Sequence, residues 1–133
     1  MIQYDPQRRT ITLHTRSTSY QMKIDATGVL LHTYYGEKLR KGDLSRLICP
    51  EDRGFSPNPD EVGMDRTWSL DTQPQEYSSS GVGDFRQPAL EADLADGSHI
   101  VDLRYVSHTV SDGKYALEGL PAFYDEGVTA QTL

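Results

Sequence analysis

Short β-type segments, separated by turn residues at close spacing, are the feature that most limits the folds open to this chain. The segments are rich in Thr, Tyr, Val, Ile and Leu, which suit the pleated, half-buried surface of a sheet. Helical periodicity rises above background nowhere, and the best candidate for a short helix is Asp43–Leu47. We therefore predict an all-β fold, a large antiparallel β-sandwich with one long loop region and little helix.

Two hairpins are predicted in the first third of the chain. The first joins Ile2–Tyr4 to Thr10–His14 across Asp5-Pro6, and we expect Ile11 and Leu13 to face inward. The second joins Ser19–Asp25 to Val29–Tyr35 through a turn, and Gly36 is expected to end its return strand. On its first strand, alternation predicts one shared face for three apolar side chains, Tyr20, Met22 and Ile24.

Periodicity is lost between Glu37 and Gln87, a stretch too long for an ordinary connection in a compact domain. Such loops are functional or disordered, and we favour function because several aromatic residues interrupt the polar sequence. Short strands around Thr67–Leu70 are expected to divide it.

Regular alternation returns with Ala89–Leu94 and His99–Ser107, which flank Asp96-Gly97 and read as the clearest hairpin of the sequence. Further strands are predicted at Lys114–Leu117 and Thr129–Leu133. Because the last run stops without a terminal turn or cap, we expect the natural chain to continue beyond it.

Length and charge narrow the classes of partner. A chain of 133 residues fits one domain, residues 1–133. With 13 basic and 20 acidic residues and a net charge of −7, the surface would repel phosphate backbones and anionic lipids. We therefore expect no nucleic-acid partner and no membrane association, and, without a signal-type start, a cytoplasmic protein.

No catalytic, metal or cofactor motif stands out from the residues. The four histidines lie far apart, and the lone Cys49 can build neither a disulfide nor a zinc site, so we predict no metal and no cofactor. Carboxylates such as Asp71 and Glu76 could serve as acid and nucleophile, but nothing places them together. The chain alone is expected to catalyse nothing.

The segments 51–59 and 65–71 carry the most suggestive chemistry. Prolines stiffen the first, while aspartate acceptors and planar arginine donors are the groups with which proteins bind vicinal hydroxyls. From the residues alone, a sugar contact and a set of salt bridges that merely pin the loop both remain open, the second being the commoner arrangement.

Several motifs in register resemble the amino-terminal domain of the family 36 glycoside hydrolases, the α-galactosidases. They cover nearly the whole chain: the strand from Gly28 to Gly36, the loop Arg53-Gly54-Phe55-Ser56-Pro57-Asn58-Pro59, the run Gly83-Asp84-Phe85-Arg86-Gln87-Pro88-Ala89, and Gly119-Leu120-Pro121-Ala122.

The resemblance implies a twisted β-sandwich of the supersandwich type that precedes a (β/α)8 barrel, and that barrel carries both catalytic aspartates. It implies retaining hydrolysis of terminal α-linked galactose from oligosaccharides such as melibiose and raffinose, without metal or organic cofactor. The expected partners are these α-galactosides, the chain's own downstream barrel, and further copies in a homo-oligomer, a homotetramer in many members.

The resemblance also implies site residues. The family's loop aspartate falls on Asp52 and the arginine of its Asp-Arg-Thr motif on Arg66, so these are the predicted sugar contacts, with Trp68 a weaker candidate that would more often be core. Two alternatives are an independent carbohydrate-binding module, which needs an exposed aromatic platform on a strand face, and a purely structural oligomerisation domain.

Overall fold

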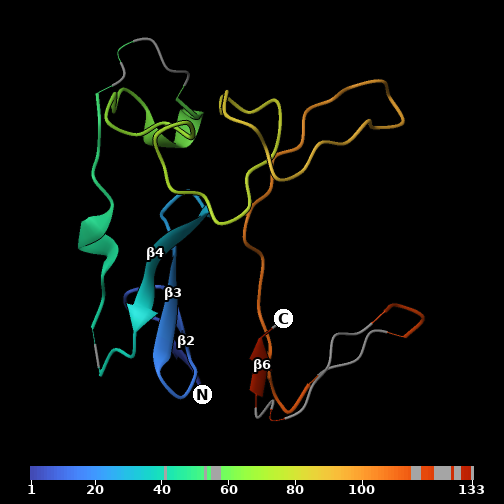
Figure 1. Cartoon of the computed structure of the whole chain (residues 1–133). Helices are drawn as coiled ribbons and strands as arrows, with labels where there is room; N and C mark the ends of the chain where they lie inside the picture. The colour runs from blue at the N-terminus through green and yellow to red at the C-terminus, as the bar shows by residue number, and fades with distance from the viewer. Residues whose placement is uncertain are drawn as a thin grey trace.

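The computed structural model describes residues 1–40, 42–52, 54, 58–114, 118–121, 127 and 130–132. Its main element is a four-stranded antiparallel sheet whose order follows the sequence: β1 (Ile2–Asp5), β2 (Thr10–His14), β3 (Thr18–Ile24) and β4 (Leu30–Glu37). A separate antiparallel pair joins β5 (Val110–Asp112) to β6 (Ala130–Thr132). Two short 3-10 turns, η1 (Ser45–Leu47) and η2 (Asp60–Val62), are the helical elements of the described residues (Figure 1).

This arrangement confirms the all-β, antiparallel class with little helix and is consistent with a β-sandwich. Both predicted hairpins form, η1 falls within the predicted helical segment, and β6 lies in the predicted terminal run. Gly36 does not end its strand, because β4 pairs with β3 as far as Glu37. No helix of the described residues is both long and apolar enough to span a bilayer.

The buried side chains of β3 are two polar ones and Ile24, which corrects part of the predicted shared face. Ile24 is buried as predicted and Ser19 and Gln21 are fully buried, whereas Tyr20 and Met22 are half-exposed, and the pairing with β4 shifts register between Gln21 and Met22. Ser19 accepts a hydrogen bond from the backbone N–H of Leu39 (2.8 Å). The chain that leaves β4 therefore covers this face of the sheet and satisfies its polar groups.

The Gln21 carboxamide joins three parts of the fold. Its Nε2 donates to Thr12 Oγ1 on β2 and to the carbonyl of Gly42, both at 2.9 Å. Its Oε1 accepts from the backbone N–H of Leu44 at 2.8 Å. The start of the long connection is thus fixed to the centre of the sheet through one buried side chain.

The long connection packs on the other end of the sheet through an apolar cluster. Leu70 is buried against Val29 and Leu31, with Trp68 and Ile48 packed around them. The backbone of Gln75 bridges to Leu31 beside β4, but Thr67–Leu70 forms turns rather than the predicted strand. Figure 1 shows this segment, in green and yellow, crossing the end of the sheet before the chain runs on to β5 and β6.

The prediction of a hairpin around Asp96-Gly97 is wrong about its two strands. The tight turn forms, with a hydrogen bond from Leu94 N–H to the Ser98 carbonyl, but its two arms do not pair along their length. Instead the Val101 N–H donates to the Ser80 carbonyl and the Tyr105 N–H to the Gly28 carbonyl. Residues distant in the sequence therefore accept the backbone hydrogen bonds of this segment. The strand predicted at Lys114–Leu117 lies almost wholly outside the described residues.

An ion pair with a buried carboxylate closes the far end of the long connection. Arg86 Nη2 lies 2.7 Å from Asp84 Oδ2, and the Asp84 side chain is only 2% exposed. Arg86 Nη2 also donates to the carbonyls of Leu70 and Gln73, both at 2.8 Å. Burial alone would raise the pKa of Asp84, but the hydrogen bonds from Arg86 outweigh that effect and lower it.

Candidate functional site

The structure brings the two predicted sugar contacts together. Arg66 Nη2 lies 3.1 Å from Asp52 Oδ1, although the two residues approach from opposite ends of the loop. The same Asp52 oxygen accepts a hydrogen bond from the backbone N–H of Gly54 at 2.8 Å, and Gly54 has a φ of +72° that favours glycine. Arg53 and residues 55–57, the other part of the motif, lie outside the described residues.

Both side chains of this ion pair face solvent. The exposed fraction is 61% for the Arg66 side chain and 52% for that of Asp52. An ion pair this exposed contributes only about 0–1 kcal/mol to stability, so it does little to hold the loop together. Among the described residues, the hydrogen bond and the ion pair of these two side chains use only Asp52 Oδ1 and Arg66 Nη2.

A local turn fixes the direction in which Arg66 leaves the chain. The Oδ1 atom of Asp65 accepts from the Thr67 N–H (2.9 Å) and from Thr67 Oγ1 (2.6 Å). The hydrogen bonds from the Thr67 side chain and backbone lower the pKa of Asp65. Asn58 Nδ2 donates to the Asp65 carbonyl from the other side of η2. Arg66 therefore lies in a turn that is closed by hydrogen bonds between its neighbours Asp65 and Thr67.

Trp68, the weaker predicted contact, is part of the packing beneath this turn. Its ring packs on the cluster of Val29, Leu31 and Leu70, and its Nε1 donates to Asp25 Oδ2 at 3.0 Å. It is half-buried and lies beside a cavity of about 280 Å³ under the loop.

The cavity beneath the loop contains residues that the sequence analysis did not single out. Lys23 from β3, Asp25 directly after it and Gln73 from the long connection line it, together with Asp65 and Trp68. Single Lys, Asp and Gln residues carry no motif, and their convergence depends on the turn at residues 69–73. The sequence therefore held no signal that could have found them.

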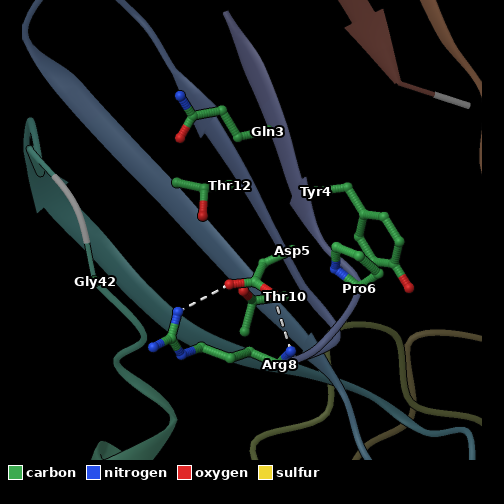
Figure 2. A pocket seen from close by; sticks show the side chains of 8 residues that line it. All are labelled: Gln3, Tyr4, Asp5, Pro6, Arg8, Thr10, Thr12 and Gly42. Carbon is green, nitrogen blue, oxygen red and sulfur yellow. Dashed lines mark hydrogen bonds and ion pairs between the residues drawn. The ribbon is translucent and has the colours of Figure 1, made fainter.

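A second, larger hollow lies at strands β1 and β2 of the sheet and was not predicted either. Its volume is about 500 Å³, and side chains of β1, β2 and the turn between them line it. Figure 2 shows Asp5 and Arg8 joined at one end of it, while Gln3 and Thr12 line it further along the strands. Asp5 also accepts from the N–H groups of Gln7 and Arg8, so the turn itself uses this carboxylate.

The histidines are dispersed over the structure, each with a different neighbour. His14 pairs with Ser19, His32 lies near Glu76, His99 pairs with Asp93 and His108 with Tyr105. In the described part of the chain, no three His, Cys, Asp or Glu side chains gather into a group that could hold a metal ion.

The geometry defines the class of protein. It is an all-β domain that presents an exposed Asp–Arg pair on a long, turn-rich connection. Residues 28–133 match the family model of the glycosyl hydrolase family 36 N-terminal domain. The chain belongs to this family.

Similar proteins agree with this assignment. The chain is 48% identical over 130 residues to the bifunctional α-galactosidase/sucrose kinase AgaSK of Mediterraneibacter gnavus, covering 98% of this chain. It is 44% identical over 125 residues to the α-galactosidase AgaA of Geobacillus stearothermophilus, covering 94% of this chain. It spans only 14% and 17% of the lengths of these two relatives.

Solved structures show the same relation. The galactosidase domain of AgaSK superposes with a TM-score of 0.87 at 48% identity, covering 95% of this chain and 18% of that chain. A variant of AgaA in complex with raffinose superposes with a TM-score of 0.76 at 44% identity, covering 86% of this chain and 16% of that chain.

Proposed function

We propose that this chain is the non-catalytic N-terminal domain of an α-galactosidase, and that its loop supplies sugar contacts to a pocket whose reacting groups lie in a downstream barrel. The relatives named above are α-galactosidases, and structures of AgaA variants have been solved with raffinose and with stachyose. These facts favour an α-galactoside oligosaccharide as the ligand of the whole protein.

The exposed Asp52–Arg66 pair is the observation that carries this proposal. A carboxylate accepts hydrogen bonds from vicinal hydroxyls while a guanidinium donates to them, so together the two groups match both hydrogen-bonding roles of a sugar. Because the exposed pair contributes little to the stability of the fold, we attribute its presence to ligand binding.

In the proposed mechanism, Asp52 and Arg66 hold the sugar while two carboxylates of the barrel perform retaining hydrolysis. Contacts remote from the reacting bond lower the barrier by fixing the ring in a reactive orientation, so their loss reduces kcat/KM. The two loop residues act by positioning the substrate.

The carbohydrate-binding-module alternative is less well supported. One pair of aromatic side chains on neighbouring strands is Tyr20 on β3 and the 68%-exposed Tyr35 on β4. Their rings are tilted by 52° with centroids 5.9 Å apart, which gives no flat surface for stacking. The Tyr20 hydroxyl also donates to Glu76.

We further propose that the domain takes part in subunit contacts. Large apolar side chains stand exposed on the later part of the described chain, such as Phe85 (80%), Val106 (88%) and Leu120 (61%). Contiguous exposed apolar surface is typical of interaction surfaces, and these side chains are the candidates for it.

The function is tested by replacing the two loop residues in the intact protein that carries this domain. Asp52→Ala and Arg66→Ala are each expected to lower kcat/KM for raffinose by about 1–3 kcal/mol, roughly 5- to 150-fold, because a charged hydrogen bond to the bound sugar is lost. Steady-state kinetics measures the change.

The matched controls are Asp5→Ala and Arg8→Ala, which break another exposed ion pair, at the β1–β2 turn. We expect these to leave kcat/KM unchanged. If the Asp52 and Arg66 variants behaved like these controls, the purely structural reading of the domain would replace the proposed one.

A further inference from the structure

Asn58 connects the segment 51–59 to the turn that carries Arg66. Its Nδ2 donates a hydrogen bond to the backbone carbonyl of Asp65, the residue directly before Arg66. The short helical turn η2 lies between the two partners and is closed by a bond from the Val62 N–H to the Pro59 carbonyl at 3.1 Å. The Asn58 side chain therefore spans η2 and joins the backbone on both sides of it.

The amide of Asn58 has one satisfied end and one unsatisfied end. A backbone carbonyl can only accept, so the amide nitrogen must face Asp65 and Oδ1 must point elsewhere. Oδ1 is buried and has no hydrogen-bond partner among the described residues. Buried polar atoms are nearly always paired, because an unpaired one costs stability. Leucine has almost the same shape without that cost, so stability alone does not explain an asparagine here.

The direction of Arg66 depends on the backbone that Asn58 holds. The Asp65 carbonyl accepts from the Trp68 N–H at 3.3 Å as well as from Asn58, so it fixes the turn from two sides. The Arg66 side chain makes one ion pair among the described residues, to Asp52, and both partners are more than half exposed. Such a pair is too weak to hold two exposed side chains in one geometry by itself. The backbone on either side must therefore aim the guanidinium.

We propose that Asn58 is a positioning residue, which holds the turn at Asp65 so that the Arg66 guanidinium meets Asp52 and the ligand in one orientation. The inference rests on the proposed function for the role of Arg66 as a sugar contact. It adds a residue that acts without touching the sugar, and it gives a reason for keeping a buried oxygen without a partner. Because Asn58 acts through Arg66, its effect on the substrate should disappear when the guanidinium is removed.

A double-mutant cycle in the intact protein tests this dependence. Asn58→Leu is expected to lower kcat/KM for raffinose about fivefold, the factor that corresponds to one neutral hydrogen bond. The midpoint of thermal unfolding should stay the same or rise, because the substitution also removes the unpaired oxygen. In the Arg66→Ala background, Asn58→Leu should cause no further loss, since residues that act through one another are not additive.

The matched control is Gln87→Leu, which replaces an exposed amide that donates to Glu91, away from this turn. It should leave kcat/KM unchanged in both backgrounds. Where Arg66→Ala itself lowers kcat/KM, two results overturn the inference. One is an equal loss from Asn58→Leu in both backgrounds, because Asn58 would then act independently of Arg66. The other is an Asn58→Leu variant with the full kcat/KM of the unchanged protein.

A crystal structure of the intact Asn58→Leu protein separates this inference from the proposed function, since it requires no sugar. We expect Arg66 Nη2 and Asp52 Oδ1 to lie more than about 4 Å apart, beyond the limit of an ion pair. An ion pair retained at its present 3.1 Å overturns the positioning role. This readout decides the role even if Arg66→Ala leaves kcat/KM unchanged, a result that counts against the proposed function alone.

Discussion

Replacing Arg86 with methionine is expected to destabilise the domain by about 3 kcal/mol. The variant leaves the Asp84 carboxylate, 2% exposed, without its charged partner, and breaking such a pair costs about 3–5 kcal/mol. Because the Arg86 side chain is itself 47% exposed, we take the lower end of that range. The carbonyls of Leu70 and Gln73 lose a donor at the same time.

Hydrogen exchange followed by mass spectrometry measures this effect on residues 70–90 within the intact protein, and the expected loss of protection is roughly a hundredfold. Arg8→Met is the matched control, because its ion pair with Asp5 lies at an exposed turn. If the two variants exchanged alike, Arg86 would not be the residue that holds this segment.

The second large effect is expected for Gln21→Leu, with a loss of about 2–4 kcal/mol. Leucine fills the site, but it leaves the Gly42 carbonyl, the Leu44 N–H and Thr12 Oγ1 without their partner. Each buried polar group that loses its bond costs about 1–3 kcal/mol, which relaxation of the chain around Gly42 partly relieves.

Thermal unfolding of the intact protein, with hydrogen exchange at β3, measures this loss. Gln3→Leu on β1 is the control, since Gln3 is an exposed glutamine of the same sheet. An equal effect of the two substitutions would show that the buried amide does not fix the long connection to the sheet.

The sequence predicts this fold well where the interacting residues lie close together along the chain, and poorly where they lie far apart along it. The β1–β2 and β3–β4 hairpins follow from alternation and local turns, and both were predicted. The prediction for β3 was wrong at Tyr20 and Met22, because the buried Gln21 takes its partners from Gly42 and Leu44, about twenty residues further on, which local periodicity cannot show. Likewise, Val101 and Tyr105 bond to Ser80 and Gly28 rather than across their own turn.

Some residues of the candidate site could likewise be predicted from the sequence, and others could not. Asp52 and Arg66 were predicted from their motifs, and the structure places them 3.1 Å apart, which no spacing rule states. Lys23 and Gln73, which line the cavity beneath the loop, carried no signal, because a single lysine or glutamine belongs to no motif. Chemistry that depends on three-dimensional convergence is therefore the part that the sequence could not show.

The central claim is that Asp52 and Arg66 form part of a sugar pocket completed elsewhere in the whole protein. A crystal structure of the intact protein with a trapped galactoside tests it most directly. The account predicts sugar oxygens within hydrogen-bonding distance, about 2.7–3.2 Å, of Asp52 or Arg66 of one subunit. A galactoside bound in the reactive pocket while both side chains face only solvent would contradict it.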